Sequence, residues 1–207
     1  TVVRGQEIKA GDRVVLAFGS GNRDEEIFPN PAKVDILRQE NRHLGFGGGI
    51  HRCLGSNLGR REDNLRRAIG LLRRYVRTRR ASSVYETAPW GLLKQPNFLN
   101  CIVEVTATIA PRQLLSAVKS IEKEMGRRPG LRYGPRLIDV DILLYGDQTV
   151  ESPDLQIPHP RMHQRAFVLV PLAELAPQLS HPAFTVTVAQ LADGVAGKDG
   201  VETWGIP

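Results

Sequence analysis

The sequence predicts an α+β fold, a ferredoxin-like antiparallel sheet with helices, preceded by a mostly irregular N-terminal extension. Two observations support this prediction. After about residue 55, apolar residues alternate between the two-residue period of strands and the three- to four-residue period of helices. Before that point, short apolar runs are separated by loops rich in glycine and proline. The predicted order strand, helix, strand, strand, helix, strand is typical of a ferredoxin-like domain.

The first three elements of the predicted domain are a strand over 50–54, a helix over 62–74 and a strand near 82–86. The helix shows an apolar stripe opposite a face of arginines. Its apolar residues are Leu65, Ala68, Ile69 and Leu72.

The next elements are a half-buried strand over 100–109, a helix opened by Pro111 and ended by Gly126, and a strand over 137–145. Another strand is expected over 167–170, followed by a short helix over 172–175. Residues 183–207 carry no motif that predicts a function.

Arg52 conflicts with the pattern of the first strand, because it stands where an apolar residue is expected. A charge that points into a core costs several kcal/mol unless it is paired or reaches solvent. We therefore expect a weak or distorted first strand.

The composition excludes several classes of protein. Two cysteines in 207 residues do not form a disulfide framework, which favours a reducing compartment and a cytoplasmic location. No apolar run has the length of a membrane span, and the first residues do not form a signal peptide. We therefore expect no membrane association.

The net charge of +6 is concentrated in arginines between residues 60 and 80 and between 127 and 136. These arginines fit solvated surfaces, a polyphosphate ligand or nucleic acid. Because zinc-finger spacing, an aromatic stacking motif and a recognition helix are all missing from the sequence, a nucleic-acid partner is not expected.

The strongest chemical signal is a pair of acidic residues, Asp139 and Asp141, in an apolar strand. Residues two apart lie on the same face of a strand, so the two carboxylates repel each other. A divalent cation removes this repulsion, and oxygen ligands suit Mg²⁺ bound to phosphate. The alternative is an ordinary solvent-facing strand edge.

Cationic residues surround this acid pair in the sequence. The segment 126–136 combines four arginines with three glycines, and His159, Arg161 and Arg165 follow downstream. Guanidinium groups bind phosphate oxygens in pairs. Acids and arginines together predict phosphoryl transfer, although each cationic residue taken singly fits an ordinary surface position.

A third cluster spans 82–91 and 95–100 and contains Trp90, Phe98 and Asn100. Such residues at strand ends suit a flat heterocycle, with rings on its faces and an amide at its edge. The alternative is a loop fixed by apolar anchors.

Five motifs in order carry a resemblance to a known family. They are Gly55–Gly59, Tyr85–Gly91, Gln95–Asn100, Gly134–Asp141 and Ile157–Met162. From about residue 54 to residue 182 the chain closely resembles 6-hydroxymethyl-7,8-dihydropterin pyrophosphokinase of folate biosynthesis. Ala88 and Leu137 depart mildly from the family pattern.

The resemblance implies an enzyme that transfers a pyrophosphoryl group from ATP to the hydroxymethyl dihydropterin, giving the pterin diphosphate and AMP. It implies two Mg²⁺ ions and small-molecule substrates, in a monomer or weak homodimer. The site residues that it implies follow by role. Asp139 and Asp141 bind metal; Arg127, Arg132 and Arg136 belong to the catalytic loop; His159 and Arg165 bind phosphates; Glu122 lies near adenosine; Thr87, Trp90, Phe98, Asn100 and Phe167 line the pterin pocket.

The N-terminal part resembles a different family. Residues 22–24, 28–31 and 46–55 are similar to the C-terminal haem-binding stretch of haem-thiolate cytochrome monooxygenases, in which Cys53 is the axial thiolate. Because the helices that hold haem are missing, haem binding through Cys53 is not expected. We therefore predict a fragment over 1–49 that is not an independent domain, and a kinase domain over 50–207. A haem-binding fragment and an inactive fusion are the alternatives.

Overall fold

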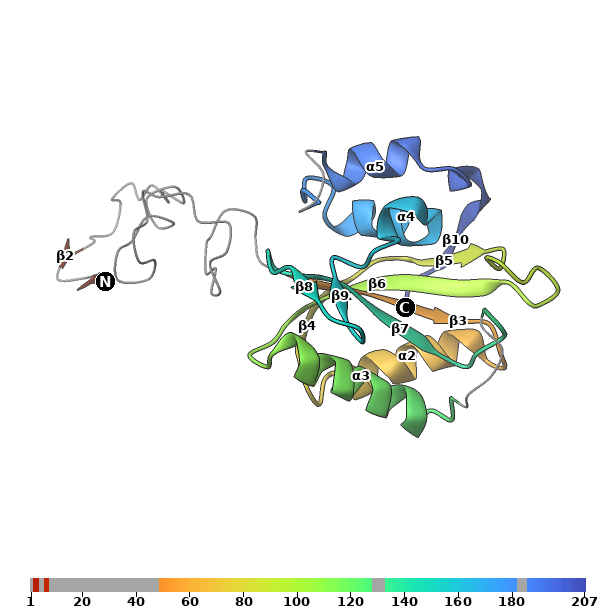
Figure 1. Ribbon diagram of the computed structural model, residues 1–207, viewed down its shortest axis with the longest axis horizontal. Helices are drawn as coiled ribbons and strands as arrows, with labels where there is room; N and C mark the ends of the chain where they lie inside the picture. Colours follow the sequence, from red (N-terminus) through yellow and green to blue (C-terminus); the bar gives the residue numbers. More distant parts are fainter. Residues whose placement is uncertain (1, 4–5, 8–48, 128–132, 182–185) are drawn as a thin grey trace. The chain divides into compact units, whose positions relative to one another are not determined.

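The computed structural model describes residues 2–3, 6–7, 49–127, 133–181 and 186–207 (Figure 1). It divides the chain into two compact units, 1–47 and 48–207. In the first unit, β1 (Val2–Val3) pairs with β2 (Gln6–Glu7) in antiparallel fashion. The other segments expected before residue 49 lie outside the described residues.

The second unit is built on a six-stranded antiparallel sheet with the order β10-β5-β6-β3-β7, in which β4 also pairs with β6. The strands are β3 (Ile50–Ser56), β4 (Arg77–Ala81), β5 (Val84–Thr87), β6 (Phe98–Thr106), β7 (Asp139–Tyr145) and β10 (Val201–Gly205). A small separate hairpin joins β8 (Val150–Glu151) to β9 (Gln156–Ile157).

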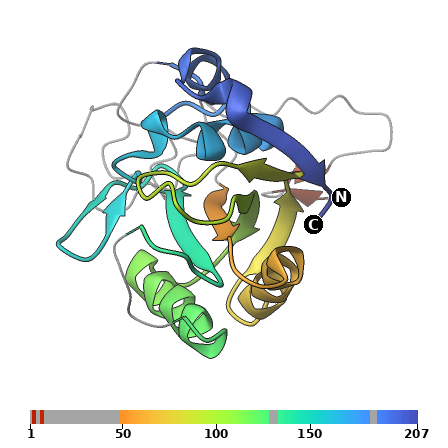
Figure 2. The same ribbon diagram turned by 90° about the vertical axis from the view of Figure 1, so that its right-hand side faces the viewer.

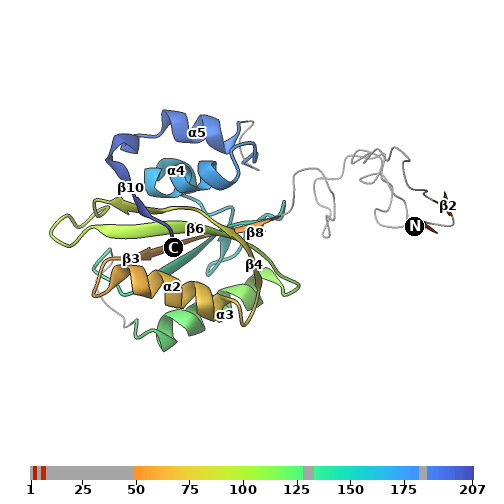
Figure 3. The same cartoon turned by 180° about the vertical axis from the view of Figure 1, so that it is seen from behind.

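Helices cover both faces of the sheet (Figure 1), and Figures 2 and 3 show the same three layers from the end and from behind. One face carries α2 (Arg61–Leu72) and α3 (Pro111–Glu124). The other carries α4 (Ala166–Leu175) and α5 (Val188–Gly194), with the short helices η1 (Met162–Gln164) and η2 (Lys198–Gly200). None of the helices in the described part of the chain is long and apolar enough to cross a membrane.

Two apolar clusters hold these layers together. Leu54, Val103 and Val140 of the sheet pack with α2 and α3. Cys53 and Ile102 point to the other face and pack with α4 and α5. Because neighbours along a strand face opposite sides, each central strand contributes to both clusters.

The predicted core elements are confirmed. Pro111 occupies the first turn of α3, and Gly126 follows this helix with a φ of 91°, the left-handed region that favours glycine. The strand expected over 167–170 is wrong, because these residues lie within α4. A short apolar run fits a buried helix and a buried strand equally well, so periodicity does not separate the two.

The sequence does not predict β4, the β8–β9 hairpin, β10 or α5. Arg77–Ala81 of β4 is mostly exposed, so this strand has little apolar signal. Residues 183–207 do contain a helix-start signal. The Thr187 hydroxyl accepts a bond from the Gln190 backbone N–H at 3.3 Å, and the Gln190 side chain accepts one from the Thr187 N–H at 2.8 Å.

Arg52 lies fully buried in the central strand β3, on the face packed against α2 and α3. Its three guanidinium nitrogens have no hydrogen-bond partner among the described residues. The pairing of β3 with β7 shifts register between His51 and Arg52, as expected for a distorted strand. Burial lowers the pKa of Arg52 to about 10, because the charged form is poorly solvated.

We therefore predict that Arg52→Met stabilises the fold. Removing a buried unpaired charge while keeping an unbranched chain should raise the free energy of unfolding by about 1–3 kcal/mol. Denaturant unfolding at pH 7 measures this change. Arg67→Met, which removes an exposed charge from α2, is the matched control and should change stability by less than about 0.5 kcal/mol.

The advantage of Arg52→Met should shrink as the pH rises past about 10. There the folded wild-type protein releases the Arg52 proton, whereas the unfolded chain keeps it to a higher pH, because burial lowers the pKa only in the folded state. The unfolded state then binds more protons, so wild-type stability rises relative to the variant. An equal advantage at pH 7 and pH 11 would contradict this account.

Candidate active site

A cavity of about 420 Å³ lies where β3, β6, β7 and the start of α4 meet. It brings together the described site residues that the sequence predicted, apart from Glu122. These are Thr87, Trp90, Phe98, Asn100, Arg127, Arg136, Asp139, Asp141, His159, Arg165 and Phe167. Arg132 lies outside the described residues.

The two acids begin β7 and face the cavity together. On the neighbouring strand, Asp139 is opposite Gly55 and Asp141 is opposite Cys53. Val140, between the acids, is buried in the α2 and α3 cluster. The strand therefore presents both carboxylates on one face, as the sequence predicted.

Two arginines neutralise Asp139. Arg127 Nη1 lies 2.6 Å from its Oδ1, and Arg136 Nη1 lies 2.6 Å from its Oδ2. Burial opposes ionisation of Asp139, but the two guanidinium groups outweigh it and hold the pKa of this carboxyl below its ordinary value. Asp139 is therefore ionised at neutral pH.

Glu122 lies buried on α3, behind Asp139, and does not line the cavity. It accepts hydrogen bonds from the Val140 backbone N–H at 2.9 Å, from Lys119 Nζ at 2.9 Å and from Arg127 Nη1. These bonds fix Arg127 and the start of β7. A contact between Glu122 and adenosine stays a prediction.

Asp141 faces a second set of basic groups. Arg165 Nη1 lies 3.3 Å from its Oδ2, and His159 Nε2 lies 3.9 Å from the same atom. The Arg161 backbone N–H donates to His159 Nδ1 at 3.2 Å, so a neutral His159 carries its proton on Nε2. Burial lowers the pKa of His159, with Asp141 opposing the shift and Arg165 and Arg161 adding to it.

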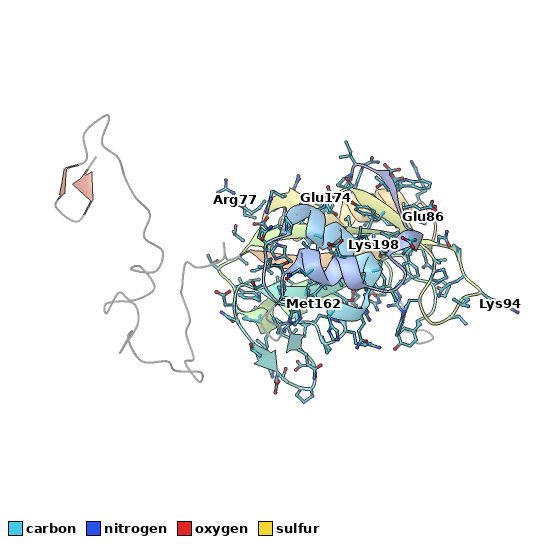
Figure 4. All side chains as sticks on the ribbon, turned by 90° about the horizontal axis from the view of Figure 1, so that it is seen from above. Arg77, Glu86, Lys94, Met162, Glu174 and Lys198 are labelled. Carbon is cyan, nitrogen blue, oxygen red and sulfur yellow. The ribbon has the colours of Figure 1, made fainter. Side chains whose placement is uncertain are left out.

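Aromatic rings form another wall of the cavity. Trp90 comes from the 88–97 loop, Phe98 from the start of β6 and Phe167 from α4. Figure 4 shows Lys94, in the same loop as Trp90, projecting at one end of the sheet, with Arg77 toward the other end. Trp90 packs edge-on against Tyr133, with ring centroids 5.3 Å apart.

A polar edge lies beside these rings. Asn100 is buried and donates from Nδ2 to the Thr87 hydroxyl at 2.9 Å. A Cβ on Gly55 would approach Asn100 Oδ1 to 2.8 Å, so glycine keeps this part of the cavity open. One amide oxygen and flat apolar walls suit a planar heterocycle with hydrogen-bonding edges.

Asn57 lies in the Gly55–Gly59 motif, and the sequence alone does not predict a role for it. Asn57 is 1% exposed and accepts from the Arg136 backbone N–H at 2.8 Å. It donates to Gln95 Oε1 at 2.9 Å and to the Pro96 carbonyl at 3.1 Å. Gln95 in turn donates to the Tyr133 carbonyl at 2.8 Å. This network joins the loop of Trp90 to the segment of Arg136.

Six further residues line the cavity: Cys53, Gly55, Ala88, Lys119, Tyr133 and Arg161. Of these, Arg161 was expected only as one of a group of cations, and Lys119 and Tyr133 were not predicted. Tyr133 and Arg161 lie inside segments that the sequence analysis singled out, and the α3 position of Lys119, one turn before Glu122, was the available signal for that residue.

The surroundings of Cys53 do not fit a haem thiolate. Cys53 is buried in the sheet, and burial, with a contribution from Asp141, raises its pKa well above the ordinary value. Cys53 is 5% exposed and packs with Ile102 in the cluster under α4 and α5, which leaves its sulfur little open space for haem iron.

The acid pair does fit magnesium. Mg²⁺ typically uses one or two carboxylates and completes its shell with water and substrate phosphates. In the described ranges, no group of three or more His, Cys, Asp or Glu side chains forms a complete metal site. Asp139 and Asp141 would therefore hold Mg²⁺ together with phosphate oxygens.

Comparison with known families gives two matches. The model of 7,8-dihydro-6-hydroxymethylpterin-pyrophosphokinase (HPPK) matches residues 52–177, more than half of the chain. The model of cytochrome P450 matches residues 1–96, less than half of it. In the overlap of the two matches, the structure has β3, α2, β4 and β5 of the sheet unit.

Curated relatives agree with the first match. The chain is 42% identical over 154 residues to the 2-amino-4-hydroxy-6-hydroxymethyldihydropteridine pyrophosphokinase of Bacillus subtilis, covering 73% of this chain and 87% of the relative. It is 40% identical over 135 residues to the Aquifex aeolicus protein of the same name, covering 65% and 84%.

Larger proteins share only this part. The match to a mitochondrial folate synthesis bifunctional protein of Arabidopsis thaliana is 48% identical and covers 59% of this chain but 22% of that protein. A solved Plasmodium falciparum HPPK-DHPS with pterin and p-hydroxybenzoate has the same fold, with a TM-score of 0.59 at 19% identity, over 72% of this chain and 43% of that one. The chain belongs to the 7,8-dihydro-6-hydroxymethylpterin-pyrophosphokinase family.

Proposed function

We propose that the 420 Å³ cavity is where this chain carries out the reaction of its family. That reaction, a step of folate biosynthesis, transfers a pyrophosphoryl group from ATP to 6-hydroxymethyl-7,8-dihydropterin and gives the pterin diphosphate and AMP. The observation that supports this site is the meeting of an acid pair, a set of cations and an aromatic wall in one cavity.

The pterin is proposed to bind against the aromatic wall. Phe98 and Phe167 would contact the faces of the ring system, and Trp90 would close the open side. Thr87 and Asn100 would hydrogen-bond its edge. The support is chemical: the buried Asn100 amide keeps its Oδ1 toward Gly55, where no side chain competes for it.

The triphosphate is proposed to bind on the cationic side, against Arg127, Arg136, His159 and Arg165. Arg132 would join them from outside the described residues. Asp139 and Asp141 would hold two Mg²⁺ ions, which offset phosphate charge when bound. Arg127 and Arg136 pair with Asp139 in this structure, and a metal on that carboxylate would leave both guanidinium groups for phosphate.

In the proposed reaction, the pterin hydroxymethyl oxygen releases its proton and attacks the β-phosphorus of ATP. The bond from that phosphorus to the bridging oxygen breaks, and AMP leaves with the electron pair. The chain contributes alignment of the two substrates and cations around the developing charge, which are the main protein contributions to phosphoryl transfer.

We also propose that residues 50–207 form the kinase domain and that it acts in the cytoplasm as a monomer or weak homodimer. Cys53 and Cys101, the cysteines of the chain, are both free thiols, which supports a reducing compartment. An inactive fusion is less well supported, because the site residues within the described ranges converge on one cavity.

Asp141→Asn should lower AMP formation from ATP and the hydroxymethyl dihydropterin by at least about 100-fold, because it removes a charge but keeps the side-chain size. A coupled AMP assay measures this. Asp199→Asn, at an exposed position, is the control and should leave the rate unchanged. Near-normal AMP release from Asp141→Asn would exclude a metal role for this residue.

Phe98→Leu and Phe167→Leu should each weaken pterin binding about 5- to 10-fold, because a leucine loses the flat ring contact. Affinity for an ATP analogue should stay the same. Titration calorimetry with each ligand separates the two effects. Tyr75→Leu replaces an exposed aromatic residue outside the cavity and serves as control. Unchanged pterin affinity in both variants would place the pterin elsewhere.

A further inference from the structure

We infer that Arg161 is a further substrate-binding residue, which contacts the β- or γ-phosphate of ATP while Tyr133 and Trp90 hold its side chain. This inference rests on the proposed function of the cavity. Arg161 contacts neutral aromatic residues, whereas the other arginines of the cavity pair with carboxylates.

The ion pairs of the cavity leave Arg161 without a carboxylate. Arg127 and Arg136 pair with Asp139, and Arg165 pairs with Asp141. Lys119 pairs with Glu122 at 2.9 Å. Among the described residues, no carboxylate lies within ion-pair distance of Arg161, so none of them neutralises its charge in the cavity.

Neutral groups nevertheless fix the position of Arg161. Its Nη1 donates to the Tyr133 hydroxyl at 2.8 Å. Its guanidinium carbon lies 5.7 Å from the Trp90 ring centroid and 5.9 Å from that of Tyr133. The two aromatic rings and the Tyr133 hydroxyl orient the guanidinium group. Its other N–H donors have no hydrogen-bond partner among the described residues.

The neighbours of Arg161 indicate the charge of its ligand. Arg161 and Arg165 both lie over the Trp90 ring, and the Arg161 backbone binds His159. Two guanidinium groups near one ring repel each other, and an anion that contacts both offsets this repulsion. A polyphosphate has oxygens on several phosphorus atoms, so it can accept hydrogen bonds from both guanidinium groups, which a single carboxylate does less well.

The position of Arg161 also explains why it would contact phosphate and not adenosine. Its guanidinium group lies over the Trp90 ring, and its backbone N–H contacts His159, whose Nε2 lies 3.9 Å from Asp141 Oδ2. The transferred phosphates must pass through this region, because they join the metal-binding acids to the pterin hydroxyl in the proposed arrangement.

The test uses Arg161→Met and Arg161→Gln in the full chain, with titration calorimetry in the presence of Mg²⁺. The probes are AMP, an oxidised hydroxymethylpterin and α,β-methylene-ATP, in which a methylene group that cannot be cleaved replaces the bridging oxygen at the bond that the reaction breaks. Both variants should bind the ATP analogue at least about 10-fold more weakly, with AMP and pterin affinity within about twofold of wild type. Arg161→Lys should recover part of the loss.

Arg67→Met, a charge removal on the exposed face of α2, controls for net charge. Unchanged affinity for the ATP analogue in the Met and Gln variants would overturn the inference, and so would a loss confined to the pterin, which would make Arg161 a support for the aromatic wall only. Failure of the wild-type chain to form AMP would reject the proposed function instead, and the two results are therefore distinguishable.

Discussion

The site depends on one electrostatic constraint: Asp139 and Asp141 are part-buried carboxylates two residues apart on one strand face, and each must be balanced by nearby cations. Arg127 and Arg136 flank the first at 2.6 Å, and Arg165 approaches the second at 3.3 Å. Because β7 must remain a paired strand to present both acids, the cations come from other parts of the chain. This requirement draws the end of α3, the segment before β7 and the start of α4 to one place.

A second constraint joins the two walls of the cavity. The buried Asn57 side chain bonds to the Arg136 backbone on one side and to Gln95 and Pro96 on the other. The loop that carries Trp90 and the segment that carries Arg136 are therefore attached to the same point at the end of β3. A displacement of either one strains a buried polar network whose unsatisfied groups are costly. The geometry thus couples the Trp90 loop to the Arg136 segment through a residue that belongs to neither.

Short-range features of the site could be read from the sequence, and features that depend on distant segments could not. The shared face of Asp139 and Asp141 follows from the two-residue period of any strand. The charge of Arg52 conflicts with its strand for an equally local reason. By contrast, Asn57 and Arg136 are 79 positions apart, and no spacing rule relates them. Part of α4 is predicted as a strand from the sequence. Its apolar residues are buried on nearly every side of the helix, so they do not show the three- to four-residue spacing that indicates a helix.

The first core strand shows how a sequence that resembles two families adopts one fold. From Gly55 onward each residue meets a specific requirement: Gly55 leaves room for Asn100, Ser56 accepts a hydrogen bond from Asn64 at 3.1 Å, and Asn57 holds two loops. Before Gly55, β3 supplies backbone pairing with β6 and β7 and buried apolar side chains to both clusters, a role that many apolar residues can fill. Cys53 fits this role as a small buried apolar residue. Arg52 fits it only at a cost in stability, which the paired neighbours on both sides of β3 offset. The constraint from the site thus begins at the glycine, whereas the residues of β3 before it have to satisfy only strand pairing and core packing.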